Sequence, residues 1–307
     1  MRVLVIGGSG FLGSYVVDEL VMAGHSVVSM SRNRERFREL SKDVEFYKAD
    51  FGNRGELECI LATKVDVVVH LVSSTIPQSS NNDIIYDVQS NLVESIALFE
   101  LCVKHGVHKV VFVSSGGTVY GAPKTELIVE DHPKQPICSY GITKLAIEYY
   151  LHLFYETFGL KYCVLRLSNP YGPRQDPLAK QGAASVFMYN VLQDKEISVW
   201  GDGSVIRDFI YASDFAKACV LAVLSEKIGV LNIGSGVGLS IKELLDAIEK
   251  ALGKFARVRW LPAREFDVPR VVLDCGRARQ ELGWKPQVSL EEGLLIMKDW
   301  MNEIIKT

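Results

Sequence analysis

The sequence lacks the features that define several classes of protein. Its 34 Lys and Arg residues do not exceed its 37 Asp and Glu residues, so it has no basic excess to follow a phosphate backbone, and we expect no nucleic-acid partner. No apolar segment reaches about 18 residues without a charge, so we expect no membrane span. Met1 leads into an apolar strand and not into a cationic region with a cleavable apolar stretch, so we expect no secretory signal.

Paired cysteines and metal-ligand spacings are also missing. The six cysteines stand singly, without a CxxC pair, which is typical of reduced thiols that fill the core of a cytosolic protein. We therefore predict a cytoplasmic location. The histidines show no metal-ligand spacing, and we predict no bound metal.

The first half of the chain alternates short apolar runs with amphipathic stretches. Several runs, such as VDVVVHL and KVVFVSS, are apolar throughout, which is typical of strands covered on both faces. Repeated strand–helix units with right-handed crossovers form a doubly wound parallel sheet, so we predict a Rossmann-type α/β fold. The predicted strands are Arg2–Ile6, Ser26–Met30, Val44–Ala49, Val65–Leu71, Lys109–Val113 and Lys161–Leu167, and the predicted helices are Phe11–Met22, Glu35–Leu40, Asn91–Lys104 and Tyr140–Thr157.

The alternation ends near Asn169, where glycine and proline become frequent. We predict a dinucleotide-binding domain over residues 1–168 and a smaller α/β substrate-binding lobe over residues 169–307, with residues 208–233 returning to the first domain. In this part of the chain the sequence predicts strands at Ile197–Trp200 and Arg257–Leu261, and helices at Ala184–Leu192, Ile241–Ala251 and Leu290–Ile304.

Three glycines in MRVLVIGGSGFLG follow the first predicted strand. Gly7 allows a tight turn, Gly10 lets a diphosphate approach the backbone, and Gly13 lets helix and strand pack closely, while the helix N-terminus faces the negative charge. This position predicts a site for NAD or NADP, a merely structural turn being the alternative. The other cofactor contacts that we predict are Phe11 and Leu12 in the turn, Asp50 and Phe51 after the third strand, and Leu71 after the fourth.

The end of the second strand distinguishes the two dinucleotides. An acidic residue there would bind the ribose 2′-hydroxyl of NAD, but this sequence has Ser31 and Arg32. A hydroxyl followed by a guanidinium suits a 2′-phosphate, which favours NADP slightly. The alternative is that Arg32, Arg34 and Arg36 begin a solvated helix.

Tyr140 and Lys144 are four residues apart at the start of a predicted helix, so they share one face. A lysine cation near the phenol favours the phenolate, and a positively charged nicotinamide would add to this effect. We therefore predict that Tyr140 takes a proton from a sugar hydroxyl while hydride leaves the same carbon. Taken alone, the spacing also fits a surface pair.

Taken together, these segments resemble the extended short-chain dehydrogenase/reductase family, and within it the nucleotide-sugar epimerase/dehydratase branch that includes the UDP-galactose (UDP-glucose) 4-epimerases. The resemblance covers nearly the whole chain. The motifs that carry it are GGSGFLG, SSGGTVYG, YGITK, RLSNPYGPRQ, GDGSVIRDFIY and ELGWKP.

The resemblance implies roles for residues in the later motifs. Asn169 would contact the sugar phosphate, and Arg207, Arg264 and Asp267 would hold the diphosphate and the nucleoside ribose of a nucleotide-diphosphate sugar. Two arginines balance the two negative charges of a diphosphate. The alternative for Arg207 is a structural ion pair with Asp208.

One position departs from the family pattern. Gly116 stands where the 4-epimerases usually carry a catalytic Ser or Thr. Thr118 and Ser115 are the two hydroxyls that we expect to replace it, and Thr118 is favoured because it lies on the same strand face as position 116. Val271 falls where 4-epimerases carry a residue that gates the 2-substituent of the sugar, and its modest volume would admit an N-acetyl group.

The resemblance favours a 4-epimerase that acts on UDP-hexoses by transient hydride transfer at C4. The alternatives are an NADPH-dependent reductase of a nucleotide-linked 4-keto-6-deoxyhexose and a non-catalytic dinucleotide sensor. A 4,6-dehydratase is disfavoured because Gly117 and Thr118 replace its Asp-Glu pair. In the related enzymes the helices predicted at Asn91–Lys104 and Tyr140–Thr157 pair into a dimer, so we expect a homodimer. The alternative is that their apolar residues, Leu145, Ile147, Tyr150, Leu153 and Phe154, pack in a monomer's core.

Overall fold

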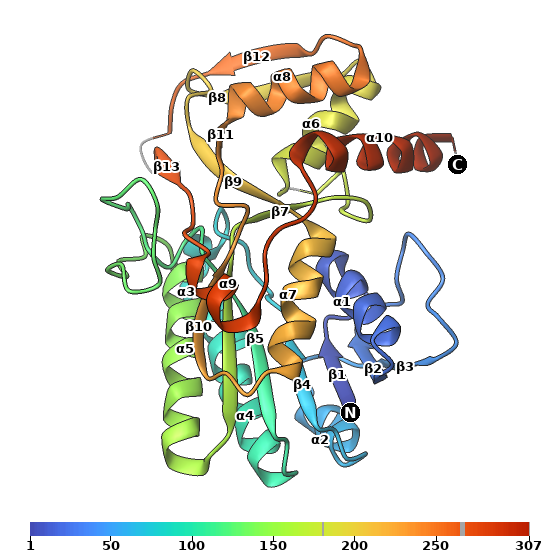
Figure 1. Cartoon of the computed structure of the whole chain (residues 1–307), viewed down its shortest axis with the longest axis vertical. Coiled ribbons are helices and arrows are strands. Elements are labelled where there is room, and N and C mark those ends of the chain that lie inside the picture. Colours follow the sequence, from blue (N-terminus) through green and yellow to red (C-terminus); the bar gives the residue numbers. More distant parts are fainter. Residues whose placement is uncertain (180, 265–267, 307) are drawn as a thin grey trace.

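A seven-stranded parallel sheet forms the larger lobe in the computed structural model, which describes residues 1–179, 181–264 and 268–306 (Figure 1). The strand order is β10-β6-β5-β4-β1-β2-β3, so the order reverses between β1 and β4. Ligands of doubly wound sheets bind at such a reversal, beyond the carboxyl ends of the strands. The strands are β1 Arg2–Ile6, β2 Ser26–Ser31, β3 Val44–Lys48, β4 Val67–His70, β5 Lys109–Ser115, β6 Lys161–Leu167 and β10 Gly229–Ile233.

Helices cover both faces of this sheet. Successive side chains of a strand point to opposite faces, so Val3 and Val5 of β1 join one hydrophobic core while Leu4 and Ile6 join another. This alternation explains why the strand sequences are apolar throughout. Helices α1 (Phe11–Met22), α7 (Ala212–Leu224) and α9 (Gly276–Leu282) contribute to the first core, and α2 (Arg54–Leu61), α4 (Glu94–Lys104) and α5 (Ser139–Phe158) to the second.

The smaller lobe stands above the carboxyl ends of the large sheet in Figure 1. Its central strand β9 (Ile206–Tyr211) pairs with β7 (Asn169–Tyr171), β11 (Gly238–Ser240) and β13 (Arg270–Val271), and β8 (Glu196–Trp200) pairs with β12 (Arg257–Leu261). A third hydrophobic core lies among α6 (Ala183–Leu192), α8 (Ile241–Leu252) and α10 (Leu290–Lys306). Within residues 208–233, α7 and β10 pack with the large sheet, whereas Phe209–Tyr211 belongs to β9 of the small one.

The structure contains every predicted strand of the first half, with ends moved by two residues or fewer. The helix predicted over Glu35–Leu40 is wrong, because this segment is irregular. Its Arg38 guanidinium pairs with Glu35 and with Asp18 of α1, so side-chain contacts fix the short segment instead of helical hydrogen bonds. The helix predicted from Asn91 is preceded by a longer helical region: α3 (Ile84–Asp87) continues through a π-helical segment, Val88–Val93, into α4.

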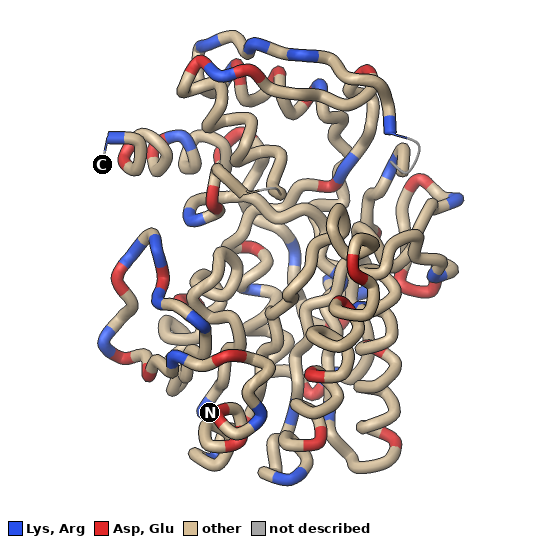
Figure 2. Tube along the Cα trace, turned by 180° about the vertical axis from the view of Figure 1, so that it is seen from behind, with Lys and Arg blue, Asp and Glu red and all other residues tan. Residues whose placement is uncertain are grey.

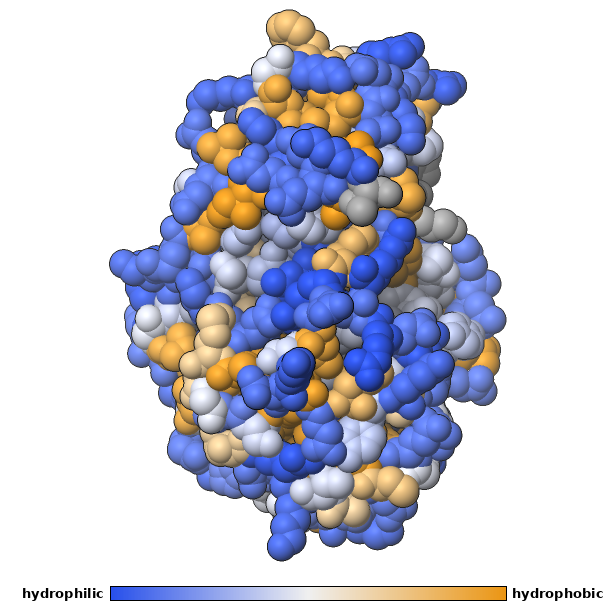
Figure 3. All heavy atoms as spheres, turned by 90° about the vertical axis from the view of Figure 1, so that its right-hand side faces the viewer, coloured by the Kyte–Doolittle hydropathy of each residue, from blue (hydrophilic) through white to orange (hydrophobic). Residues whose placement is uncertain are grey.

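The surface carries charges of both signs. Figure 2 shows Lys and Arg interspersed with Asp and Glu along the trace. Figure 3 shows the side that bears α1 and the C-terminal helix, where apolar residues lie in scattered patches among hydrophilic ones. None of the helices in the described part of the chain combines the length and hydropathy of a membrane-spanning segment.

Candidate active site

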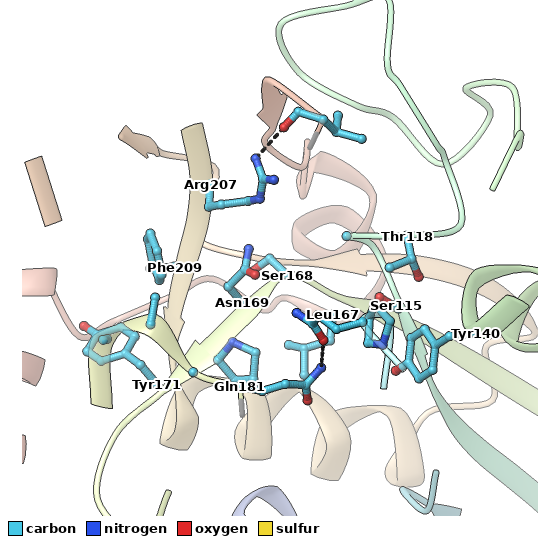
Figure 4. A pocket seen from close by; sticks show the side chains of 18 of the residues that line it. Ser115, Thr118, Tyr140, Leu167, Ser168, Asn169, Tyr171, Gln181, Arg207 and Phe209 are labelled. Atoms are coloured by element: carbon cyan, nitrogen blue, oxygen red, sulfur yellow. Dashed lines mark hydrogen bonds between the residues drawn. The ribbon is translucent and has the colours of Figure 1, made fainter. Parts of the chain in front are cut away.

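A cavity of about 1020 Å³ lies between the large sheet and the smaller lobe. Its floor includes Leu71 after β4, Ser115 at the end of β5 and Leu167 at the end of β6, and its far wall includes Trp200 and Arg207 of the smaller lobe. The cavity therefore occupies the position in which doubly wound sheets bind ligands. Figure 4 shows side chains from both lobes directed into it.

Tyr140 and Lys144 both line this cavity from the first turns of α5. The Lys144 ammonium donates a 3.0 Å hydrogen bond to the Val113 carbonyl, and it lies 4.7 Å from the Phe112 ring centroid and 5.7 Å from that of Tyr140. The Tyr140 hydroxyl lies beside Ser115, which lowers the pKa of the phenol. The structure thus brings together the predicted pair and one of the two predicted hydroxyls.

The chain's own groups raise the pKa of Tyr140, which is opposite to the direction expected from the sequence. Burial is the main cause, and the thiol of Cys138 and the carboxyl of Asp87 add to it, while hydrogen bonding to Ser115 lowers the pKa. Burial lowers the pKa of Lys144 to about 8, against the opposing influence of Glu148 and Asp87. Lys144, whose ammonium hydrogen-bonds the Val113 carbonyl, is not among the groups that shift the pKa of Tyr140 most.

Two further residues that carry hydroxyl groups line the cavity. These are Thr118 and Ser168, and the oxygen of each is buried without a hydrogen-bond partner among the described residues. Buried polar atoms are rarely left unpaired in folded proteins, so each oxygen is a candidate to bind a ligand hydroxyl. Thr118 was predicted from the sequence, and Ser168 was not.

The glycine turn has the geometry of a dinucleotide site. Gly7 has a φ of 88°, in the left-handed region that favours glycine. A Cβ on Gly13 would lie 2.0 Å from the Gly7 carbonyl oxygen, so no larger residue fits there. Gly10, at the N-cap of α1, provides no side-chain cap, which leaves the first N–H groups of the helix directed at an incoming anion. These residues fit a dinucleotide pyrophosphate.

The other predicted cofactor residues are in different surroundings. The Ser31 hydroxyl accepts from the Ser9 N–H at 3.1 Å and donates to the Met30 carbonyl at 2.7 Å, so it ties the glycine turn to β2, and Arg32 is exposed. Asp50 is exposed, and its carboxylate accepts from the Gly52 N–H.

Leu12 and Leu71 line the main cavity, and Phe11 lines a smaller one of about 230 Å³ beside the turn. Phe51 is instead a core residue that packs against His70, with ring centroids 4.9 Å apart.

The predicted substrate residues differ in how far they reach the cavity. Asn169 and Arg207 line it, Asn169 donating to the Asp208 carbonyl at 3.1 Å and Arg207 donating to the carbonyls of Ile206 and Val268. Arg264 also lines it, with its guanidinium carbon 5.2 Å from the Trp200 ring centroid.

The Asp208 carboxylate is buried and accepts four hydrogen bonds, from the N–H and hydroxyl of Ser235 and from the N–H groups of Gly236 and Leu273. This carboxylate joins β9 to two loops. Val271 is 2% exposed and packs with Val119, Tyr120 and Leu273, so it is not among the described residues that line the cavity. Asp267 lies outside the described residues.

Besides Ser168, sequence reasoning missed Asp87, Asn91 and Trp200. Asp87 and Asn91 are four residues apart on one helical face and form a buried hydrogen-bond network with the start of α5. Their spacing was visible in the sequence, but the neighbouring helix was not. Trp200 is 43% exposed at the cavity wall, in a strand that sequence reasoning found without noting this side chain.

Comparisons with known proteins agree with this geometry. Residues 3–234 match the model of the NAD dependent epimerase/dehydratase family. The chain is 35% identical to a putative UDP-glucose 4-epimerase of Methanocaldococcus jannaschii, with 99% of this chain and 100% of that protein covered. It is 37% identical to a UDP-glucose 4-epimerase of Mycolicibacterium smegmatis, with 96% of each covered, and 32% identical to a dTDP-4-dehydro-6-deoxyglucose reductase of Escherichia coli, with 95% of each covered.

Solved structures show the same similarity. The crystal structure of the Thermotoga maritima UDP-glucose 4-epimerase with UDP-glucose is 34% identical and has a TM-score of 0.95, with 99% of this chain and 100% of that chain covered. The Thermus thermophilus UDP-glucose 4-epimerase in complex with NAD is also 34% identical, with a TM-score of 0.93 and 98% and 99% of the two chains covered. The match extends over more than half of the chain, and the chain therefore belongs to the NAD dependent epimerase/dehydratase family.

Proposed function

We propose that this chain is a nucleotide-sugar 4-epimerase of the UDP-glucose/UDP-galactose type. The observation that carries the proposal is one cavity that contains Tyr140 and Lys144 at its floor and Arg207 and Arg264 at its far wall. This arrangement suits a substrate with a reacting sugar at one end and an anionic diphosphate and nucleoside at the other. The similarity of the chain to the Mycolicibacterium and Thermotoga UDP-glucose 4-epimerases supports the same function.

The cofactor that we propose is one retained NAD. The Ser31 hydroxyl is already engaged with the Ser9 N–H and the Met30 carbonyl, which weakens the argument for a 2′-phosphate, and the solved Thermus relative is a complex with NAD. The pyrophosphate would lie at Gly7, Gly10 and Gly13. Bound NAD supplies a hydride acceptor that returns the hydride within the same catalytic cycle.

Tyr140 would exchange a proton with the C4 hydroxyl of the sugar. Burial opposes formation of the phenolate, so ionisation depends on hydrogen bonding to Ser115 and on positive charge brought close to the ring. Thr118, with its buried and unpartnered oxygen, would hydrogen-bond the same sugar oxygen. Turning the 4-keto sugar about its diphosphate linkage would present its other face for the return of hydride.

The nucleotide end of the substrate would lie along the smaller lobe. We propose that Asn169 contacts the sugar phosphate and that Arg207, Arg264 and Asp267 hold the diphosphate and ribose. Trp200 offers a partly exposed aromatic face in this wall for the base.

We also propose a cytoplasmic homodimer. Large apolar side chains are exposed on α3, α5 and the π-helical segment, whereas the opposite side of the molecule in Figure 3 has only scattered ones. These three segments contact one another, and exposed apolar side chains gathered on neighbouring elements are typical of an interface. Ile147 and Phe154 are core residues, as the alternative expected. We therefore propose a dimer face formed by other exposed side chains: Ile84, Ile85, Tyr86, Val93, Ile142, Tyr149 and Leu153.

The second candidate is reduction of a nucleotide-linked 4-keto-6-deoxyhexose with NADPH, which the 32% identity to the Escherichia coli reductase favours. NMR of the purified protein with UDP-galactose, without added cofactor, separates the two. Appearance of UDP-glucose supports the epimerase. No conversion, followed by NADPH oxidation with a 4-keto-6-deoxy nucleotide sugar, would overturn it in favour of the reductase.

A further inference from the structure

Asp87 is fully buried at the end of α3, and its carboxylate accepts hydrogen bonds from four side chains. One oxygen accepts from Thr75 and from Asn91, the latter at 3.0 Å. The other accepts from Ser139 at 2.6 Å and from Thr143 at 2.8 Å. All four donors are hydroxyl or amide groups, so hydrogen bonds rather than an ion pair hold this carboxylate.

Two of these donors flank the reacting tyrosine. Ser139 immediately precedes Tyr140, and Thr143 is three residues after it, so both lie within the first five residues of α5. The N-cap residue Cys138 makes no side-chain cap hydrogen bond, and the Ser139 N–H donates instead to the Asn81 side chain at 2.8 Å. The start of α5 is therefore held by hydrogen bonds to Asn81 and Asp87, which precede it in the chain.

The four hydrogen bonds require a carboxylate, because both of its oxygens accept. An amide of the same shape accepts through one oxygen only, and its NH2 group would meet the remaining pair of donors as a further donor. Burying a carboxylate carries a desolvation penalty, which here is reduced by four donors and by the positive end of the α5 dipole. A charge kept in such a place acts on the groups around it.

Those groups are the catalytic pair. Asp87 raises the pKa of Tyr140, together with Cys138 and against hydrogen bonding to Ser115. It also raises the pKa of Lys144, together with Glu148 on the next turn of α5 and against burial. On the β4 side, His70 is buried and neutral, since burial and the Lys144 cation lower its pKa to about 3.

We propose that Asp87 is a positioning residue, which fixes the start of α5 through Ser139 and Thr143 and thereby holds the Tyr140 hydroxyl beside Ser115. The inference rests on the proposed function, because Tyr140 is the group that exchanges the proton. Asp87 itself is not among the described residues that line the cavity.

The first test is Asp87→Asn, measured as kcat and KM for sugar interconversion across pH. We expect kcat to fall by about tenfold to a hundredfold with KM within about twofold, because a small misplacement of the reacting group affects the chemical step more than binding. Since Asp87 raises the pKa of both Tyr140 and Lys144, both limbs of the pH profile should move to lower pH. An unchanged kcat, or an unmoved profile, would overturn the proposal.

A matched pair keeps the test decisive if Asp87→Asn does not fold. Each variant removes one hydroxyl donor to the Asp87 carboxylate. Thr143→Val removes the donor from α5 to one oxygen, and Thr75→Val removes a donor to the other oxygen. A merely structural network predicts similar losses of kcat in both variants. A positioning role predicts that Thr143→Val loses at least about fivefold more kcat than Thr75→Val, a difference far above the error of such measurements.

A third measurement does not depend on the sugar. In protein labelled with ¹³C at lysine Cε, the Lys144 resonance is assigned by its absence in Lys144→Met, and its titration is followed in wild type and in Asp87→Asn. We expect the titration to move to lower pH in the variant. If the wild type converts no UDP-sugar, the proposed function fails, but this titration still tests the influence of Asp87 on Lys144. If the Lys144 titration is the same in both proteins, the proposed role of Asp87 is overturned.

Discussion

A side chain at position 116 and the side chain of Leu273 compete for one space. A Cβ on Gly116 would lie 2.5 Å from Leu273 Cδ1 and 3.2 Å from the Arg166 carbonyl oxygen. Leu273 is fully buried, and its backbone N–H donates to the Asp208 carboxylate, so it is held in place. Leu273 thus occupies the space that a side chain at position 116 would need.

The first prediction follows from this competition for space. Gly116→Ser should lower the free energy of unfolding by about 1–3 kcal/mol, because overpacking forces Leu273 from its position. In urea denaturation, the double variant with Leu273→Ala should be less destabilised than the sum of the single variants by about 1 kcal/mol. Additive losses would show that the two side chains do not share this space.

Thr118 and Ser115 are predicted to behave differently when their hydroxyls are removed. Thr118→Val removes a buried unpartnered oxygen, so it should raise the free energy of unfolding by about 1 kcal/mol while lowering kcat. Ser115→Ala removes a hydrogen bond that lowers the pKa of Tyr140, so the acidic limb of the pH–rate profile should move to higher pH. Thermal unfolding and kcat measured across pH check both effects, and a Thr118→Val variant with full activity would remove Thr118 from the mechanism.

The glycine turn gives a third prediction. Gly13→Ala places a Cβ 2.0 Å from the Gly7 oxygen, so the purified variant should contain no NAD by absorbance and by mass spectrometry of the released nucleotide. Gly24→Ala is the matched control, since no atom lies within 4 Å of a Cβ added to Gly24. The substitution is strained only by the φ of 77° at this residue. That control should lose about 1–2 kcal/mol of stability and still retain NAD. Retention of NAD by Gly13→Ala would contradict the assignment.

Features set by local pattern were predictable from the sequence. The run Arg2–Ile6 is a strand with the predicted ends, because its residues are apolar on both faces and a glycine turn follows. The pairing of Tyr140 with Lys144 was predictable for a similar reason, since a helix places residues four apart on one face.

Features that depend on packing between distant segments were not predictable. The segment Glu35–Leu40 has helical periodicity, but it is irregular and its Arg38 forms an ion pair with Asp18 of α1. Leu273 reaches Gly116 from more than 150 residues away, and Asp87 reaches Thr143 across the start of α5. The direction of the Tyr140 pKa shift was also not predictable from the sequence. Its main cause is burial, which is a property of the folded chain.

The last prediction concerns the burial of Lys144. Its pKa is lowered from 10.5 to about 8, so below pH 8 the folded state carries a buried cation that the unfolded state exposes to water. As the pH rises through 8, the folded state releases this proton first and the penalty disappears, so the stability contributed by this residue increases with pH and is complete above 10.5. Compared with Lys144→Met, the wild type should therefore gain up to about 3 kcal/mol of unfolding free energy between pH 7 and 10.

Urea denaturation of both proteins at several pH values in this range measures the difference, and the comparison cancels the titration of the other lysines and tyrosines. A constant difference would mean that Lys144 has an ordinary pKa in the folded chain. A difference that falls with pH would mean that the carboxylates of Glu148 and Asp87 outweigh burial and raise the pKa instead.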